Sequence, residues 1–192
     1  QFLINEDTKE LLIIDPADRA QGIIDWIQSE GLKPVAILLT HGHFDHIMAV
    51  EELRKEYQIP MYASKDEVEV LANPQLNVST MMGAYVSMKA DELFADGDVL
   101  ELAGMKLKVI STPGHTIGSV CFYIEEEKML ISGDTLFEAS VGRTDFPTGS
   151  SRQLIHSIKT RLFILPEDVN VFPGHGEVTS IAYEKTHNPF IF

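Results

Sequence analysis

The 192-residue sequence is poor in cysteine and in cations: it has one cysteine, Cys121, and 15 Lys and Arg residues against 29 Asp and Glu residues. One cysteine cannot form an internal disulfide, which excludes a disulfide-stabilised secreted domain and predicts a cytoplasmic location. No apolar run reaches the roughly 20 residues of a membrane-spanning helix, so we expect no membrane partner. The formal net charge of −14 repels phosphates, and no basic run opposes it, so we expect no nucleic-acid partner.

Hydrophobic residues make up 44% of the chain and charged residues 23%, which is the composition of a globular protein with a buried core. The sequence shows no internal repeat, low-complexity tract or linker, so we expect a single domain over residues 1–192. The first residue is Gln1 rather than Met, so we expect N-terminal sequence, which can include a targeting peptide, to precede it.

Apolar periodicity divides the first part of the chain into alternating strands and helices. Asp18 with Gln21 predicts a capping box that begins a helix, and Gly31 predicts its end. A second capping box, Ser64 with Glu67, predicts the start of another helix. The expected elements are strands at 2–4, 11–14 and 35–39, helices at 18–30 and 47–57, and a short strand after Pro60.

The second half has a different pattern, in which short strands are separated by Gly, Pro or charged turns. Residues 73–92 lack clear periodicity and are interpreted as a long surface segment, or a lid over something apolar. The expected later elements are strands at 99–102, 105–110, 119–124, 128–131 and 169–172, and a helix through Leu154, Ile158 and Leu162.

Five of the seven histidines lie in three short segments, at residues 40–46, 113–116 and 173–176. Each segment directly follows a strand-like run, and so does a fourth polar segment at residues 132–135. Loops that follow strands gather at one edge of a sheet, where binding and catalytic residues concentrate. We therefore expect these four strand ends to converge on one site.

The spacing within the segments is typical of metal ligands. His41 and His43 are two residues apart, so in an extended loop both side chains point the same way and can bind one metal ion. A turn near Asp45 would direct Asp45 and His46 toward a second ion, and Asp134 is the candidate to bridge the two. Imidazole and carboxylate ligands suit zinc, iron or manganese, and the absence of ligand cysteines argues against a closed structural zinc site.

The same motifs resemble those of the metallo-β-lactamase superfamily, and within it the hydroxyacylglutathione hydrolases (glyoxalase II) and their single-domain bacterial relatives. The resemblance runs over nearly the whole chain, and it includes Arg143 after Gly142, and Glu184 with Asn188. It implies an α/β fold, the four-layer αββα sandwich of two mixed β-sheets flanked by helices, with the sequence starting after the first strand of that fold.

The resemblance also implies an activity, the hydrolysis of a thioester of a low-molecular-weight thiol by a hydroxide that bridges two divalent metal ions. Zinc is the expected metal, and iron or manganese also fit. Asp134 and Asp45 are the expected catalytic residues, and Arg143 is the expected substrate-binding residue. The implied ligands are His41, His43 and His115 for one metal, Asp45, His46 and His175 for the other, and Asp134 for both.

Other activities remain alternatives at this stage. A persulfide dioxygenase also resembles the sequence, including residues 142–146, and would bind one iron through His41, His115 and Asp134. A β-lactamase is disfavoured because lactamases of this fold generally have Cys or another non-bridging residue where Asp134 stands. A nuclease is disfavoured by the charge, and a non-catalytic metal-binding module by open coordination positions.

Several residues have a structural interpretation beside a functional one. Asp15 can orient a metal ligand or simply form a turn before Pro16. Arg143 can bind substrate or form a surface ion pair with Asp145. For His156, His187 and Cys121 we expect structural roles only.

Overall fold

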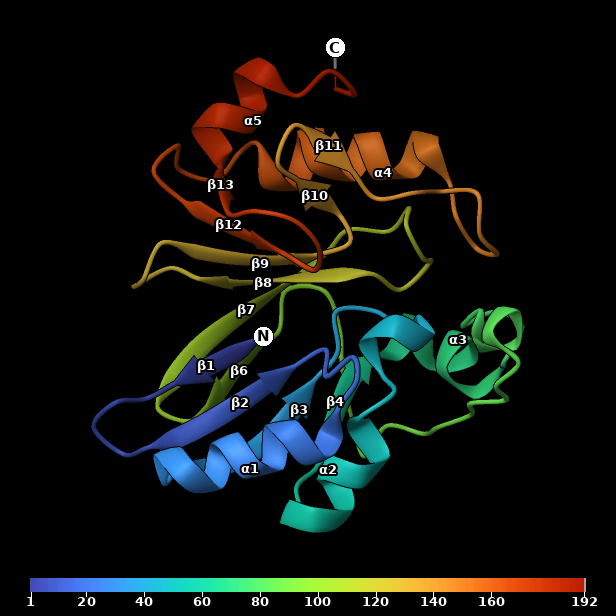
Figure 1. Ribbon diagram of the computed structural model, residues 1–192. Helices are drawn as coiled ribbons and strands as arrows, with labels where there is room; N and C mark the ends of the chain where they lie inside the picture. The colour runs from blue at the N-terminus through green and yellow to red at the C-terminus, as the bar shows by residue number, and fades with distance from the viewer. Residues whose placement is uncertain (192) are drawn as a thin grey trace.

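The structure is a computed structural model that describes residues 1–191, and it contains two β-sheets that face each other with helices outside them (Figure 1). In the first sheet β1 pairs antiparallel with β2, and the other neighbours are parallel. Its strands, in spatial order, are β1 (Phe2–Ile4), β2 (Glu10–Ile14), β3 (Lys33–Leu38), β4 (Met61–Ser64) and β5 (Glu92–Phe94).

The second sheet is mixed, because β12 runs parallel to β9 and all other neighbours are antiparallel. A separate hairpin, β10 (Leu136–Phe137) and β11 (Ser140–Val141), follows β9. The second sheet contains, in spatial order, β13 (Thr179–Ser180), β12 (Asn170–Pro173), β9 (Met129–Gly133), β8 (Val120–Ile124), β7 (Met105–Ser111) and β6 (Val99–Leu102).

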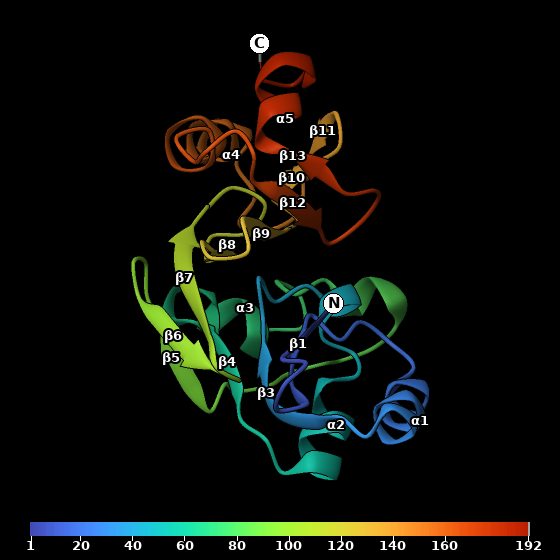
Figure 2. The ribbon, with the colours of Figure 1, turned by 90° about the vertical axis from the view of Figure 1, so that its left-hand side faces the viewer.

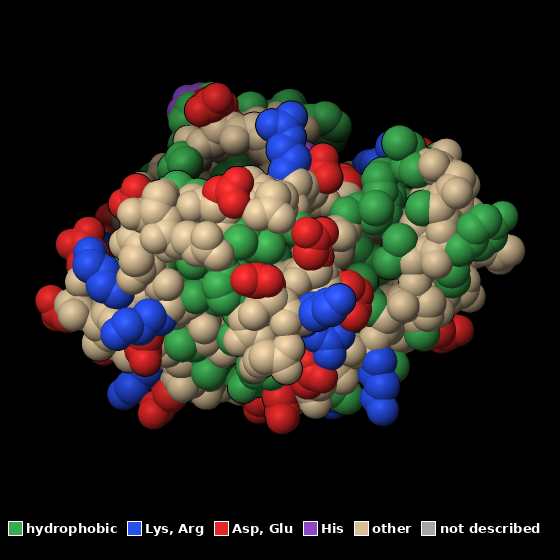
Figure 3. Space-filling view, turned by 60° about the horizontal axis from the view of Figure 1, so that its bottom comes forward, with side chains coloured by type: hydrophobic (Ala, Val, Ile, Leu, Met, Phe, Trp, Pro, Cys, Tyr) green, Lys and Arg blue, Asp and Glu red, His purple; other side chains and the backbone are tan. Residues whose placement is uncertain are grey.

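Helices α1, α2, α4 and α5 lie on the outer sides of the sheets in both ribbon views, and α3 lies to the right of the sheets in Figure 1 (Figures 1 and 2). Helices α1 and α2 cover the first sheet, and α4 and α5 lie beyond the second, so the order of layers is αββα. Acidic and basic side chains are interspersed over the face that carries α1 and α2 (Figure 3). The helices are α1 (Ala20–Glu30), α2 (Val50–Tyr57), α3 (Val68–Ala72), α4 (Ser151–Ser157), which continues as a π-helix (Ile158–Leu162), and α5 (Ile181–His187).

The layers follow from strands that are apolar on both faces. In β2, Leu11 and Ile13 pack in the cluster under α1 and α2, whereas Leu12 and Ile14 pack in the cluster between the sheets. In β8, likewise, Phe122 faces the first sheet, and its neighbours face α4. This alternation confirms the predicted four-layer α/β fold and holds the ends of the strands at fixed positions.

Neither predicted capping box forms in full. Helix α1 begins two residues into the predicted segment, and the side chain of Asp18 accepts a hydrogen bond from the Arg19 amide at 2.6 Å instead of capping the helix. Ser64 does cap a short 3₁₀-helix (Lys65–Glu67), but the Glu67 carboxylate points away to the histidine loops. The predicted end at Gly31 is confirmed, with φ at 63°.

Other differences lie where the sequence has little periodicity. Residues 73–92 contain a 3₁₀-helix (Ser79–Met82) and lead into the three-residue strand β5, which the sequence did not indicate. The short strands β10, β11 and β13 and the helix α5 were also not predicted. Within residues 1–191, no helix has the length and apolar character needed to cross a membrane.

Candidate metal centre

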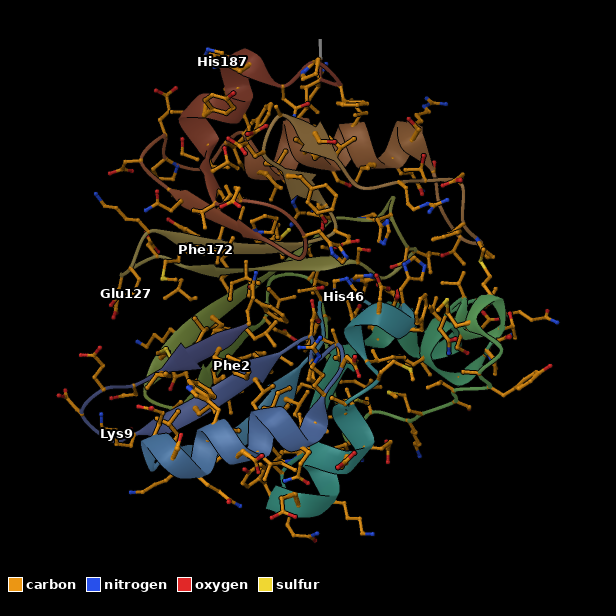
Figure 4. The ribbon with its side chains drawn as sticks, in the orientation of Figure 1. Phe2, Lys9, His46, Glu127, Phe172 and His187 are labelled. Carbon is orange, nitrogen blue, oxygen red and sulfur yellow. The ribbon has the colours of Figure 1, made fainter. Side chains whose placement is uncertain are left out.

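The predicted convergence of four strand ends is confirmed. Strand β3 leads to His41, β7 to His115, β9 to Asp134 and β12 to His175, all at one edge of the paired sheets. A 3₁₀-helix (Phe44–His46) turns the chain directly after His43. Figure 4 shows His46 between the two sheets, pointing into the interior of the molecule.

His41, His43 and His115 form the first group of possible ligands, and all three are buried. One nitrogen of each ring lies within 4.8 Å of the others, and His43 Nδ1 is 2.8 Å from His115 Nε2. The buried Nε2 atoms of His41 and His43 have no hydrogen-bond partner. Buried nitrogens that converge without partners are costly unless a cation binds them, so this group fits a metal ion.

Asp45, His46 and His175 form the second group. His175 Nε2 lies 3.3 Å from Asp45 Oδ2 and 3.3 Å from His46 Nε2. His175 is 56% exposed and Asp45 42% exposed, so this group opens to solvent whereas the first does not. Two imidazoles and a carboxylate are a donor set suited to zinc or iron, and open access is typical of catalytic rather than structural sites.

Asp134 lies between the two groups. Its Oδ1 is 3.3 Å from His46 Nε2, and its Oδ2 is 3.6 Å from His115 Nε2 and 3.7 Å from His175 Nε2. The Oδ1 atom is buried and forms no well-aligned hydrogen bond. The structure therefore brings all seven predicted ligands together and places this carboxylate where it can contact two ions.

Further hydrogen bonds fix the orientation of the rings. Asp15 accepts bonds from the Thr40 amide at 2.8 Å and the Thr40 hydroxyl at 2.6 Å, and its Oδ2 is 3.1 Å from His46 Nδ1. His41 Nδ1 lies 3.1 Å from Thr40 Oγ1. Of the two interpretations of Asp15, the structure supports the orienting one, because partners on Nδ1 leave Nε2 free to ligate a metal.

His115 is oriented in the same way, since its Nδ1 donates to the backbone carbonyl of Arg143 at 2.7 Å. Burial lowers the pKa of His115, and lowers the pKa of His43 to about 3, so both rings are neutral at pH 7. Neutral imidazole is the form that binds metal ions. Burial also opposes the charged form of His46, but the adjacent carboxylates of Asp134 and Asp15 outweigh it and raise its pKa to about 10.

Glycines permit the close approach of these segments. A Cβ on Gly174 would lie 2.4 Å from Asp134 Oδ1 and 2.7 Å from His46 Cε1. A Cβ on Gly142 would lie 1.8 Å from the backbone oxygen of Asp134. All three distances are far below van der Waals contact, so any larger residue at either position must displace the aspartate or the backbone around it.

Sequence reasoning missed Glu67, a carboxylate that is 1% exposed. Its Oε1 accepts from the Gly42 amide at 2.8 Å, and its Oε2 accepts from the Thr116 hydroxyl at 2.9 Å and the Gly118 amide at 2.8 Å. Glu67 thus joins the loop that carries His41 and His43 to the loop that follows His115. The capping-box motif hid this role, because Ser64 and Glu67 have that spacing by themselves.

A pocket of about 510 Å³ opens over the two groups. Arg143 lines it, but its guanidinium donates two hydrogen bonds of 2.8 Å to Asp145 and lies 3.7 Å above the ring of Phe146. The exposed Met81 and Met82 line it as well, so part of the segment 73–92 does border an apolar space, as the lid interpretation predicted.

The remaining singled-out residues lie elsewhere. His187 stacks on Tyr183 at the outer end of α5, far from His46 in Figure 4. His156 lies on α4 and belongs to none of the ligand groups found in residues 1–191. Cys121 is fully buried, and burial raises the pKa of its thiol to about 11, as suits an inert core side chain.

The fold and this cluster of candidate ligands are of the metallo-β-lactamase type. The sequence pattern described as "Metallo-beta-lactamase superfamily" matches residues 1–175, and the chain belongs to this superfamily. The probable metallo-hydrolase YqgX of Bacillus subtilis is 42% identical over 192 residues, which cover 99% of this chain and 90% of that protein. Hydroxyacylglutathione hydrolase GloC of Haemophilus influenzae is 35% identical over 192 residues, with 98% and 91% covered.

Solved structures are similar as well. BLEG-1 B3 metallo-beta-lactamase superposes with a TM-score of 0.94 at 42% identity, covering 99% of this chain and 92% of that chain. TTHA1623, in a di-iron-bound form, superposes with a TM-score of 0.88 at 34% identity, covering 99% of this chain and 93% of that chain. ETHE1 from Myxococcus xanthus superposes with a TM-score of 0.78 at 30% identity, covering 98% of this chain and 76% of that chain.

Proposed function

We propose that this protein hydrolyses thioesters of low-molecular-weight thiols with two divalent metal ions, for which zinc is the expected metal. The observation that carries the proposal is the position of Asp134, whose two oxygens face the histidines of both ligand groups. The name of the GloC relative supports thioester chemistry, and the two-metal form of TTHA1623 supports a dinuclear centre and leaves iron as an alternative metal.

In this proposal His41, His43 and His115 would hold one ion, Asp45, His46 and His175 would hold the other, and Asp134 would serve as a ligand between them. When bound, the two ions supply Lewis acidity, which polarises a carbonyl oxygen and lowers the pKa of water. Burial opposes the charged form of Asp134, but the adjacent His46 outweighs it and lowers the pKa, so the carboxylate stays ionised at neutral pH.

The chain itself positions the reactants. Asp15 and the Arg143 carbonyl face Nδ1 of His46 and of His115, so Nε2 of both rings is turned toward the site. In the net reaction the oxygen of water forms a bond to the acyl carbon, the carbon–sulfur bond breaks, and the thiolate takes the released proton. A thiolate is a stable leaving group, so this reaction needs no separate general acid.

A persulfide dioxygenase is the second candidate, favoured by the structural similarity to ETHE1. It would need only one iron, held by His41, His115 and Asp134. The presence of the complete second group, including the solvent-open pair Asp45 and His175, favours the two-metal hydrolase over this candidate.

The test compares zinc-loaded and iron-loaded protein on three substrates: an S-lactoyl thioester, a persulfide and a chromogenic cephalosporin. We expect thiol release from the thioester by the metal-loaded protein, loss of release after chelation, and its return when metal is restored. Asp134→Asn should release thiol at least a hundredfold more slowly, because an amide cannot supply the same charge to both groups.

The outcomes separate the candidates. Oxygen uptake on the persulfide by a protein with one iron per chain, without thioester turnover, contradicts the proposal in favour of the dioxygenase. Hydrolysis of the cephalosporin alone contradicts it in favour of a lactamase, the activity in the name of BLEG-1. Tight metal binding without turnover of any of the three substrates contradicts it in favour of a binding module.

A further inference from the structure

The walls of the pocket above the metal centre are apolar. Apart from the five residues that belong to the ligand groups, the only polar side chains among its lining residues are Ser140 and Arg143. Met81 and Met82 are both 68% exposed, so they present their side chains to the pocket mouth and to solvent. The rest of the wall consists of Phe44, Phe137, Val141 and Phe146.

The one cation of this lining, Arg143, already has a carboxylate partner in the chain. Asp145 accepts from its Nε and from one terminal nitrogen, both at 2.8 Å, which is the two-point geometry that a substrate carboxylate would need. The pair lies beside the ring of Phe146, which Arg143 covers at 3.7 Å. A substrate carboxylate that binds Arg143 in this two-point way must therefore displace Asp145, and it must also approach a chain with a net charge of −14.

We propose that the pocket selects thioesters by apolar contact and not by charge, and that Asp145 is a specificity-determining residue that keeps Arg143 from binding a substrate carboxylate. The proposal rests on the function proposed above and names its substrate class: thioesters with an uncharged thiol and an apolar acyl chain. Hydrophobic side chains gather at the right of the face in Figure 3, on the side of the molecule that carries α3 and the segment after it.

The first experiment measures kcat/KM for thioesters of N-acetylcysteamine, an uncharged thiol, with acyl chains from acetyl to hexanoyl. A methylene moved from water to an apolar wall raises the ratio by up to about fourfold, so we expect an increase of about twofold to fourfold for each added carbon. The double variant Met81→Ser/Met82→Ser should flatten this series. Ile164→Ser removes another exposed apolar side chain, 73% exposed and outside the pocket, and should leave the slope unchanged.

The second experiment tests Asp145 with one acyl group on two thiols, glutathione and N-acetylcysteamine. The native protein should have the higher kcat/KM on the uncharged thiol. Asp145→Asn removes the negative charge that pairs with Arg143. It should therefore raise kcat/KM for the glutathione thioester by about tenfold relative to kcat/KM for the N-acetylcysteamine thioester. Asp168→Asn, which breaks the exposed ion pair with Lys128, is the matched control and should not change this preference.

Binding of S-alkyl thioethers of N-acetylcysteamine, measured by calorimetry on metal-loaded protein, separates this proposal from the proposed function because thioethers cannot be hydrolysed. Affinity that increases with alkyl length supports the apolar pocket even if no thioester turns over, in which case the proposed function alone fails. A flat thioether series, or a native preference for the glutathione thioester that Asp145→Asn leaves unchanged, overturns the inference.

Discussion

Replacing Glu67 by glutamine should weaken metal binding although Glu67 contacts none of the proposed ligands. The carboxylate is buried and accepts from Gly42, Thr116 and Gly118, which belong to the two loops that carry the first ligand group. Glutamine keeps one acceptor oxygen and replaces the other by an NH₂ donor. The Thr116 hydroxyl can rotate to accept from that group, but the amide of Gly42 or Gly118 is left without a partner.

The magnitude follows from that unpaired amide. A buried N–H without an acceptor costs about 1–3 kcal/mol, and the loop can avoid the cost by moving to where water reaches the amide. Metal binding requires the original loop position, so the apparent metal affinity should fall by a factor of about 5 to 150. A variant that moves this loop therefore lowers metal affinity without removing any ligand. The expected size agrees with the loss of about 10-fold to 100-fold in metal affinity that is typical when residues that orient metal ligands are replaced.

The assay is competition with a chromophoric chelator at pH 8, where the Glu67 carboxylate is ionised. Glu184→Gln is the matched control, because Glu184 is also fully buried and accepts from Thr179, Asn188 and the Ala139 amide, none of which adjoins a ligand. The metal affinity of the Glu184→Gln variant should stay within about twofold of the native value. Native metal affinity in Glu67→Gln, or an equal loss in both variants, would refute the reasoning.

Three further predictions concern stability and the metal. Burial raises the pKa of Glu67 from 4.5 to about 7, so the folded state holds this proton more tightly than the unfolded state does. The unfolding free energy of the metal-free native protein, compared with that of Glu67→Gln, should therefore fall by about 3 kcal/mol between pH 4.5 and pH 8. Urea titrations at the two pH values measure this change. Gly174→Ala should lose most of its metal, measured by elemental analysis, because the added Cβ meets Asp134 at 2.4 Å; native metal content would contradict this. Gly22→Ala, at an exposed position of α1 whose Cβ meets only Arg19 at 3.9 Å, should stabilise the protein by about 0.5–1 kcal/mol, and a lower melting temperature would count against that assignment.

The alternation of strands and helices and the spacing of the first ligands could be predicted from the sequence because both are local patterns, whereas the four-layer arrangement and the division of the ligands between two metals were implied by the resemblance to the metallo-β-lactamase superfamily. Continuous apolar runs such as residues 35–39 indicate strands buried on both faces, and His41 and His43 occur at the spacing at which side chains share a direction. The ends of α1 show where local patterns fail. Asp18 and Gln21 have capping-box spacing, but Asp18 binds the adjacent amide and the helix begins later.

What the sequence could not show depends on contacts between distant segments. Glu67 reaches Gly118, 51 residues away, and no local signal distinguishes that contact from a helix cap. Similarly, the sequence left open whether Arg143 binds substrate or pairs with Asp145. The structure places the two side chains in contact beside the pocket, and this contact is the basis of the proposed selection against negatively charged substrates.

The most direct test of the central claim, that seven side chains hold two ions with Asp134 between them, is the metal content of the protein after reconstitution and removal of excess metal. The account predicts two ions per chain for the native protein and one for Asp45→Ala, which lacks a carboxylate of the second group only. A native protein that holds a single ion, or an Asp45→Ala variant that retains both, would contradict it.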